Sequence, residues 1–426
     1  MMDLSGRCDG YFVFVMLMMA GLIGVCINGE NDGDSVGAPM VKTEQEALYS
    51  AIQGFVGKWW NGSDLYPDPC GWTPIQGVSC DIYDGFWYVT ELSIGQIHDN
   101  SLPCAQNLKF RPQFFKLQHL KSLSVFNCII SPSRGPISIQ SANWDAFSST
   151  IESIEFRANP GLTGQIPTSF GNLKKLQSLV LIDNGLSGGL PVSIGKLTQL
   201  KRLVLSGNLL KGKIPESYGY LSELLILDLS RNSLSGRLPL TFGGLTSLLK
   251  FDLSKNLIGG EIPSEISNLK NLTLLDLSNN KISGGLTFAS QEMSSLEELI
   301  LSSNPISGDL VNFKWQNVYS LMVLDLSNMR LTGEIPELIS SLKNLRFLGL
   351  SDNKLSGNLS PKLAELRNLT ALYVNGNNLT GELKFPREFY MKMGRRFGVR
   401  NNSNLCFPVD KLSTSVRPFG VKVCRE

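Results

Sequence analysis

Cysteine and histidine are the residues of this chain best suited to metal binding, nucleophilic attack or acid–base work. The chain has eight cysteines but only two histidines, His98 and His119. Neither histidine lies in a nucleophile–base pattern, no H-E-x-x-H motif occurs, and the glycines recur at a regular interval instead of forming a phosphate-binding loop. We therefore predict no catalytic residue, no metal site and no cofactor, and a protein that is not an enzyme.

Six of the cysteines are predicted to form disulfides. Residues 11–27 are apolar and carry no charge, which predicts a secretory signal peptide over residues 1–29. The alternative is an N-terminal membrane anchor, because Asp3 and Asp9 are unusual at the start of a signal peptide. Cleavage would leave an even number of cysteines, as expected of a secreted protein. They are Cys70, Cys80, Cys104, Cys128, Cys406 and Cys424.

The spacing of these cysteines suggests how they pair. Cys70 and Cys80 favour a disulfide over a zinc site, because zinc would need further ligands and no histidine is near. We expect Cys104 to bridge to Cys128 and Cys406 to bridge to Cys424, although six cysteines allow fifteen connectivities.

Acidic and aromatic residues recur at positions that suggest binding. Asp228, Asp252 and Asp276 are spaced by 24 residues, and Asp325 continues the row beyond Ile300. Such a row could receive a basic peptide, but a solvated scaffold row is the favoured interpretation, because Leu-Asp-Leu-Ser is a common form of this repeat. Phe347 and Tyr373 lie beside each other in successive repeats, and Phe126 is expected to face the same way. Aromatic side chains often carry interface energy, so these residues are candidate ligand contacts.

A sequence repeat determines where these residues lie. Asparagine recurs every 24 residues from Asn184 to Asn304, and Asn353 and Asn377 continue the register after a longer step. The template L-x-x-L-x-L-x-x-N-x-L-x-G-x-I-P is a leucine-rich repeat, and a fixed period of this size indicates a solenoid. One unit cannot bury its leucines alone, so neighbouring units must stack. The asparagine amide can satisfy backbone groups of adjacent turns that would otherwise be buried unpaired.

The repeat predicts an α/β leucine-rich-repeat solenoid: a curved, right-handed superhelix with a parallel sheet on its concave side and disulfide-capped ends. The positions six, four, two and one residues before each asparagine should be exposed on the concave face. The expected parts are a signal peptide (1–29), a helical cap (30–95), irregular first repeats (96–150), regular repeats (151–383) and a basic C-terminal cap (384–426).

Some local features depart from the repeat. Thr43 and Glu46 form a predicted capping box for a helix whose apolar face includes Leu48, Ile52 and Phe55. Residues 129–147 are expected to form a loop inserted between repeats. Met329 replaces a repeat asparagine, and the aromatic stretch 312–319 before it is interpreted as convex packing, with a contact surface as the alternative.

The C-terminal segment and the glycosylation sequons bear on partners. Residues 384–426 contain ten lysines and arginines against three acidic residues, so this end could attract an anionic cell-wall polysaccharide or membrane surface; a solvated cap is the alternative. The whole chain has a formal charge of +2, which is too balanced for nucleic-acid binding. No membrane-spanning run follows the repeats. Predicted glycan acceptors are Asn61, Asn271, Asn358, Asn368, Asn378 and Asn401.

The G-x-I-P form of the repeat, with Cys-Gly-Trp before it and Asn-Leu-Cys after it, resembles plant extracellular leucine-rich-repeat proteins. The run from Thr43 to Tyr49, followed by Lys-Trp-Trp60, resembles most the Piriformospora indica-insensitive protein 2 group of receptor-like proteins. That resemblance implies a secreted or cell-surface protein in root responses to a fungal endophyte, without catalytic residues. It would bind a peptide or protein and act with a membrane receptor kinase. The alternative function is inhibition of microbial wall-degrading enzymes, similar to polygalacturonase inhibitors.

Overall fold

The computed structural model describes residues 38–96, 104–105, 108–130, 137–288, 293–408 and 417–424. The chain separates into two units, residues 1–37 and 38–426, and the described residues all belong to the second. The predicted signal peptide and His98 lie outside the described residues.

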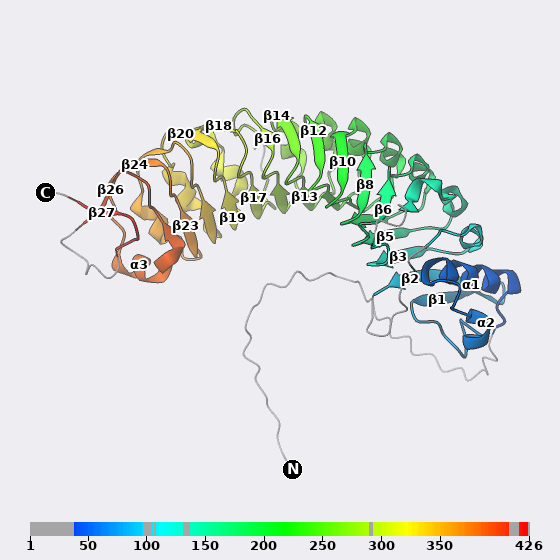
Figure 1. Ribbon diagram of the computed structural model, residues 1–426. Helices are drawn as coiled ribbons and strands as arrows, with labels where there is room; N and C mark the ends of the chain where they lie inside the picture. Colours follow the sequence, from blue (N-terminus) through cyan, green and yellow to red (C-terminus); the bar gives the residue numbers. More distant parts are fainter. Residues whose placement is uncertain are drawn as a thin grey trace, which may run out of the picture. The chain divides into compact units, whose positions relative to one another are not determined.

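One sheet of fourteen strands forms the concave side of the repeat unit (Figure 1). Each strand after β2 pairs in parallel with the strand of the next repeat, and only the first pair, β1 with β2, is antiparallel. The strands in order are β1 (Val78–Tyr83), β2 (Phe86–Gly95), β3 (Ser122–Phe126), β5 (Ser153–Arg157), β7 (Ser178–Ile182), β9 (Arg202–Val204), β11 (Ile226–Asp228), β13 (Lys250–Asp252), β15 (Leu274–Asp276), β17 (Glu298–Ile300), β19 (Val323–Asp325), β21 (Phe347–Gly349), β23 (Ala371–Tyr373) and β25 (Phe397–Gly398).

Short strands and 3₁₀ helices form the rest of each turn. The second extended segments pair into a seven-stranded sheet of β4 (Ile137–Ser138), β6 (Leu162–Gly164), β8 (Gly185–Gly188), β10 (Leu209–Lys213), β12 (Ser233–Gly236), β14 (Leu257–Gly260) and β16 (Lys281–Ile282). Smaller sheets continue it with β18 (Ser307–Asp309) and β20 (Arg330–Thr332), then β22 (Ser356–Asn358), β24 (Asn378–Glu382), β26 (Asn404–Phe407) and β27 (Lys422–Val423).

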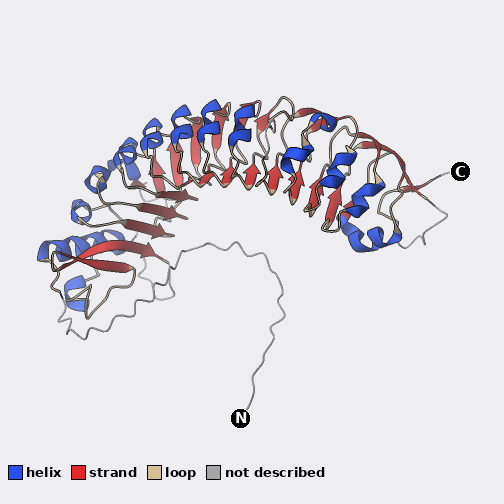
Figure 2. Ribbon diagram, turned by 180° about the vertical axis from the view of Figure 1, so that it is seen from behind, coloured by secondary structure: helices blue, strands red, loops and turns tan. Residues whose placement is uncertain are grey.

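The 3₁₀ helices line the side opposite the large sheet (Figure 2). They are η1 (Pro112–Lys116), η3 (Ile139–Ser141), η4 (Trp144–Phe147), η5 (Thr168–Asn172), η6 (Val192–Lys196), η7 (Glu216–Tyr220), η8 (Leu240–Gly244), η9 (Ser264–Asn268), η10 (Leu310–Asn312), η11 (Trp315–Val318), η12 (Glu337–Ser341) and η13 (Pro361–Glu365). The last 3₁₀ helix of the described chain, η14 (Gly394–Arg396), belongs to the C-terminal cap. A proline that follows isoleucine or leucine precedes the first helical residue at η6 to η9 and supplies a suitable φ angle there.

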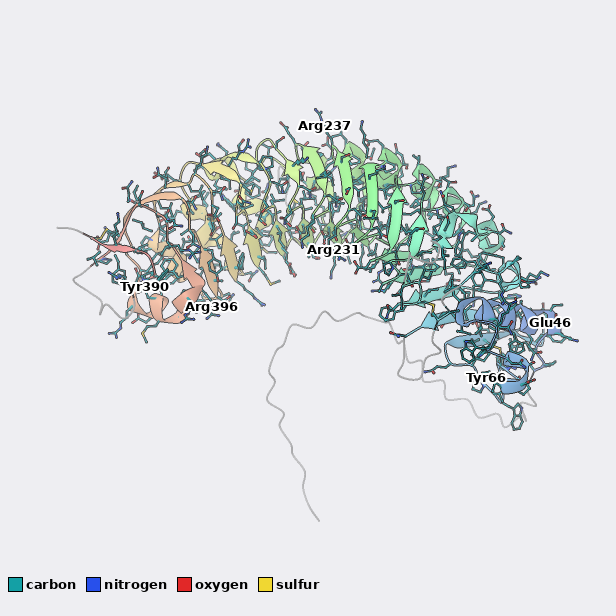
Figure 3. The ribbon with its side chains drawn as sticks, viewed as in Figure 1. Glu46, Tyr66, Arg231, Arg237, Tyr390 and Arg396 are labelled. Atoms are coloured by element: carbon teal, nitrogen blue, oxygen red, sulfur yellow. A yellow bond between two sulfur atoms is a disulfide. The ribbon has the colours of Figure 1, made fainter. Side chains whose placement is uncertain are left out.

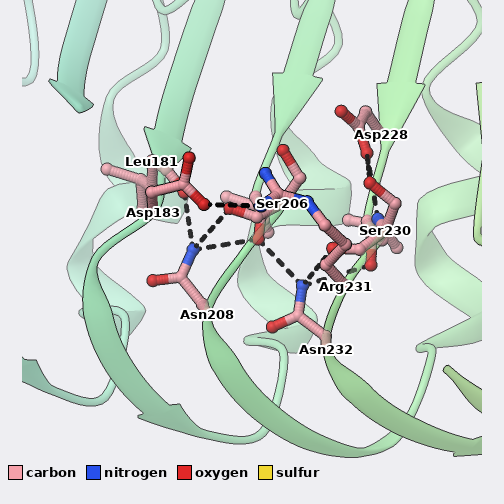
Figure 4. A network of polar contacts seen from close by, with 10 residues as sticks. Leu181, Asp183, Ser206, Asn208, Asp228, Ser230, Arg231 and Asn232 are labelled. Atoms are coloured by element: carbon pink, nitrogen blue, oxygen red, sulfur yellow. Dashed lines mark hydrogen bonds and ion pairs between the residues drawn. The ribbon is translucent and has the colours of Figure 1, made fainter. Parts of the chain in front are cut away.

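The repeat asparagines form a continuous ladder of hydrogen bonds inside the solenoid. The Asn208 amide donates to the carbonyls of Leu181 and Leu205, and the Asn232 amide likewise donates to those of Leu205 and Leu229 (Figure 4). The side-chain oxygen of each accepts a backbone N–H of the preceding turn; for Asn256 the donor is Leu234. The repeat leucines around this ladder are almost fully buried, so the sequence prediction of the core is confirmed.

A second ladder, not expected from sequence, packs the convex side. The hydroxyls of Ser193, Ser217 and Thr241 donate to backbone carbonyls of the preceding repeat at 2.7 to 2.9 Å. Glycines two residues after these positions let neighbouring 3₁₀ helices approach closely. A Cβ atom added at Gly219 would lie 2.3 Å from the Thr241 carbonyl oxygen, so a side chain there would force the backbone to shift.

The N-terminal cap contains α1 (Lys42–Val56) and α2 (Gly62–Leu65). The predicted apolar face of α1 is buried, but the predicted capping box is wrong, because the helix begins at Lys42 with Val41 as its N-cap and no side chain caps it. Glu44 instead points into the protein, where its Oε1 accepts the Val89 N–H at 3.3 Å. Thr43 therefore lies within the first helical turn, where it cannot act as the cap.

The described residues contain three disulfides near the two ends of the repeats: Cys70–Cys80, Cys104–Cys128 and Cys406–Cys424. These are the pairs suggested by their spacing in the sequence. The last bridge joins β26 to the residue after β27, and the C-terminal helix α3 (Arg387–Met393) buries Phe389, Tyr390 and Met393 in the core.

Two irregular stretches contribute to the core. The prediction that residues 129–147 form an inserted loop is wrong for residues 137–147, because β4 pairs with β6 and both Trp144 and Phe147 are buried. The convex-packing interpretation of residues 312–319 is confirmed for Phe313 and Trp315, which are buried. Met329 is buried at the ladder position that lacks an asparagine.

The concave face and its C-terminal pocket

One row of side chains connects most of the ligand-binding residues predicted from sequence. The parallel register aligns Asp228 with Asp252 and Asp252 with Asp276, then continues through Ile300, Asp325 and Gly349 to Tyr373. We call the positions Asp228, Asp252, Asp276, Ile300, Asp325, Gly349 and Tyr373 the concave row. Figure 3 shows Arg231 on the concave side of the repeats and Arg237 on the opposite side.

The aspartates of the concave row are half-buried and each is held by a local hydrogen bond. One carboxylate oxygen accepts the backbone N–H of the serine two residues later, as Asp252 does from Ser254 at 2.8 Å. Burial, and then the neighbouring charges of Asp228 and Asp276, raise the pKa of Asp252 to about 6. Burial also raises the pKa of Asp276. The row therefore combines a structural role with a half-buried acidic strip on the concave face.

The aromatic pair lies at the C-terminal end of the concave row. The rings of Phe347 and Tyr373 have centroids 5.8 Å apart and are tilted by 52°. Gly349 makes room for this arrangement, because a Cβ atom there would lie 2.6 Å from a carboxylate oxygen of Asp325 and 2.9 Å from the Phe347 ring. The glycine thus allows an acidic group and an aromatic group to lie close together on the exposed face.

A pocket of about 890 Å³ borders Tyr373, where the concave face meets the C-terminal cap. Its lining includes Tyr373 of β23, Tyr390 of α3 and three arginines, Arg395, Arg400 and Arg417. Figure 3 shows Tyr390 and Arg396 at this end of the repeats. Gly398 leaves space beside the Tyr373 ring, since a Cβ atom there would lie 2.7 Å from it.

The pocket combines residues that sequence reasoning did not group together. Arg395 comes from η14, Arg400 follows β25, and Arg417 and Phe419 come from the last described segment. The sequence feature that pointed to this region was the excess of basic residues in segment 384–426. It did not reveal the pocket, because that depends on how α3 and the final segment fold back beside the last strands.

The remaining candidate residues lie elsewhere. Phe126 is 36% exposed on β3, near the N-terminal end of the sheet, and aligns with Arg157; it is not brought to the aromatic pair. His119 stacks on Tyr83 with ring centroids 4.0 Å apart. Within the described parts of the chain, no group of three or more histidine, cysteine or acidic residues is placed to hold a metal ion. All six sequon asparagines are exposed.

The repeats match a known family. The Leucine Rich Repeat family pattern matches residues 199–221, 223–245, 247–269, 271–291, 320–342 and 344–366. These six segments are leucine-rich repeats, and the solenoid that contains them has the fold of that family. The chain resembles plant receptor-like proteins: it is 57% identical over 175 residues to the Piriformospora indica-insensitive protein 2 of Arabidopsis thaliana, and 34% identical over 152 residues to Receptor like protein 29 of the same plant.

These matches cover only parts of the proteins. The first covers 40% of this leucine-rich-repeat chain and 40% of its relative, and the second covers 35% and 31%. Among solved structures, a TDR receptor is similar with a TM-score of 0.54 and 30% identity, over 68% of this chain and 52% of that one. A plant ice-binding protein has a TM-score of 0.56 over 90% of this chain and 98% of its own length, but at 24% identity it shows the fold alone.

Proposed function

We propose that this leucine-rich-repeat protein is an extracellular recognition protein that binds a peptide or protein through the concave row and acts with a membrane receptor kinase. The observation that carries the proposal is the in-register alignment of half-buried carboxylates with an aromatic pair on one sheet. Its similarity to a receptor-like protein and to a TDR receptor supports a role in recognition. The non-catalytic character predicted from sequence fits such a role.

The dimensions of the concave row favour an extended ligand. Adjacent strands lie about 4.8 Å apart, so the six steps from Asp228 to Tyr373 span about 29 Å. An extended peptide rises about 3.3 Å per residue, so about nine residues would cross the row. Basic side chains would face the aspartates, and an apolar or aromatic side chain would contact Phe347 and Tyr373.

We also propose the setting in which this binding occurs. The protein would be secreted to the apoplast and held at the outer face of the plasma membrane by its partner. In the described parts of the chain, no helix has the length and apolar character needed to cross a bilayer. The name of the first relative refers to insensitivity to Piriformospora indica, and we propose a role in a plant's response to that organism. Glycans at the six exposed sequons would accompany secretion.

Affinity purification from root tissue tests the proposal. The tagged, secreted protein is recovered after mild crosslinking, and bound proteins are identified by mass spectrometry. We expect a membrane receptor kinase, and we expect it to be lost from the Phe347→Ala, Tyr373→Ala variant. A matched control, Tyr220→Ala with Leu240→Ala, removes two exposed side chains from the convex helices and should retain the kinase.

Two outcomes contradict the proposal. Recovery of a microbial glycosidase, together with inhibition of that enzyme by the protein alone in solution, would support the inhibitor alternative. Loss of the kinase from the convex control, with retention by the aromatic variant, would place the binding surface away from the concave row.

A further inference from the structure

The C-terminal pocket contains a cluster of positive charge. Arg395, Arg400 and Arg417 line it, all three are exposed, and its lining contains no carboxylate. Within the described residues, the ion pairs join other side chains and none involves these three arginines. The backbone N–H of Arg400 is held by the Asn375 side chain at 3.1 Å, so this arginine extends from a fixed position on the sheet.

The chemistry of the pocket suits a carboxylated sugar. A guanidinium group binds a carboxylate through two parallel hydrogen bonds, which a compact ammonium group cannot do. Tyr373 and Phe419 add aromatic side chains to the lining, and Phe419 is 84% exposed. An aromatic face can pack against the apolar C–H face of a sugar ring while the guanidinium groups hold its acidic substituent.

The positive charge extends beyond the pocket, which favours a polymer over a single small anion. The described residues from 384 onward contain eight basic side chains and one acidic side chain, Glu388. Five of the basic residues lie outside the pocket lining and are exposed: Lys384, Arg387, Lys392, Arg396 and Lys422. A chain with one carboxylate on each sugar could reach from the pocket onto this surface.

The position of the pocket favours a linear chain over a membrane surface. Tyr373 and Asn375 belong to the concave side of the last repeats, and α3 borders the same pocket. A flat bilayer cannot enter a concave recess of this kind, whereas a flexible polymer can. We infer that the pocket binds a linear polyuronate, a polymer of uronic acids, and that the surrounding basic cap binds the flanking residues of the same polymer. This site shares Tyr373 with the concave row, but its three arginines lie outside that row.

Binding of polygalacturonate to the purified full-length secreted protein tests the inference. Wild-type protein should bind short, unesterified polygalacturonate oligomers, and raising salt from about 50 to about 200 mM should weaken the binding because exposed charges are screened. Arg395→Gln, Arg400→Gln and Arg417→Gln together should weaken it at least tenfold. The matched triple Lys384→Gln, Arg387→Gln and Lys422→Gln removes the same charge outside the pocket and should weaken it clearly less.

Several results would overturn the inference. These are absence of polygalacturonate binding by wild-type protein, equal weakening by the two triple variants, or equal affinity for the fully methyl-esterified polymer. Tighter binding to vesicles containing phosphatidylserine, or to a polyglutamate peptide, would assign the pocket to those partners instead. The Asp228→Asn, Asp252→Asn, Asp276→Asn variant leaves every residue of the pocket lining intact, so it should weaken kinase recovery without changing polyuronate binding. The two proposals can therefore fail independently.

Discussion

The asparagine ladder makes a quantitative prediction about two substitutions that look equivalent in sequence. In Asn256→Leu, the Leu234 N–H loses its acceptor. The carbonyls of Leu229 and Leu253 keep a second donor, because the amides of Asn232 and Asn280 also bond to them. One buried backbone group is therefore left unpaired, at about 1–3 kcal/mol.

Asn304 lies next to the break in the ladder, so its loss should cost more. In Asn304→Leu, the Ile282 N–H loses its acceptor. The Leu301 carbonyl also loses its donor, and no second asparagine replaces it because Met329 occupies the next ladder position. Two unpaired groups imply about 2–6 kcal/mol, so we expect Asn304→Leu to exceed Asn256→Leu by about 1–3 kcal/mol. The added leucine volume is common to both variants and cancels in the comparison.

Urea denaturation followed by tryptophan fluorescence measures this difference. Lys250→Leu places the same side chain at an exposed site of β13 and should leave the midpoint nearly unchanged. The order of midpoints should be Lys250→Leu, then Asn256→Leu, then Asn304→Leu as the lowest. If Asn256→Leu is as destabilising as Asn304→Leu, or if all three variants unfold together, the account of the ladder is refuted.

Three further predictions concern other parts of the fold and site. Gly219→Ala should lower the midpoint of thermal unfolding, because the added Cβ atom would lie 2.3 Å from the Thr241 backbone. Gly189→Ala is the control: the atom nearest to its Cβ would be 3.8 Å away, so its midpoint should stay unchanged. Burial raises the pKa of Glu44 from 4.5 to about 7, so between these pH values the folded state binds a proton that the unfolded state has lost. The free energy of unfolding should therefore fall as the pH rises from 4.5 to about 7. The Glu44→Gln variant cannot titrate at this position, so its free energy of unfolding should fall less over the same range. An unchanged pH profile in that variant would contradict the assignment. Gly349→Ala should displace Phe347 or Asp325 and weaken ligand binding with little loss of stability; unaltered binding would argue against the aromatic pair as a contact.

Sequence reasoning predicted the features that repeat. The asparagine period, the buried leucines and the alignment of Asp228, Asp252 and Asp276 all follow from one template, because each repeat places the same position on the same face. The disulfide pairs could also be predicted, because each joins two cysteines that are close in sequence near one end of the repeats.

Features that depend on contacts between different parts of the chain were missed. Glu44 differs from the neighbouring Glu46 only by its burial against the backbone of Val89, which no local pattern reveals. The ladder of Ser and Thr hydroxyl groups on the convex side could not be predicted, because it depends on the spacing between neighbouring 3₁₀ helices. The C-terminal pocket forms only where α3 and the segment containing Arg417 come together beside the last strands. The excess of basic residues therefore indicated a basic C-terminal end but did not locate a site.

The measurement that tests the central claim most directly is a calorimetric titration of the recovered receptor-kinase ectodomain, or of its peptide, into purified variants of this protein. The account predicts that Phe347→Ala and the charge-neutral Asp228→Asn, Asp252→Asn, Asp276→Asn variant each weaken binding at least tenfold, while Tyr220→Ala with Leu240→Ala binds like wild type. Unchanged affinity in both concave-face variants, with binding lost in the convex variant, would contradict it.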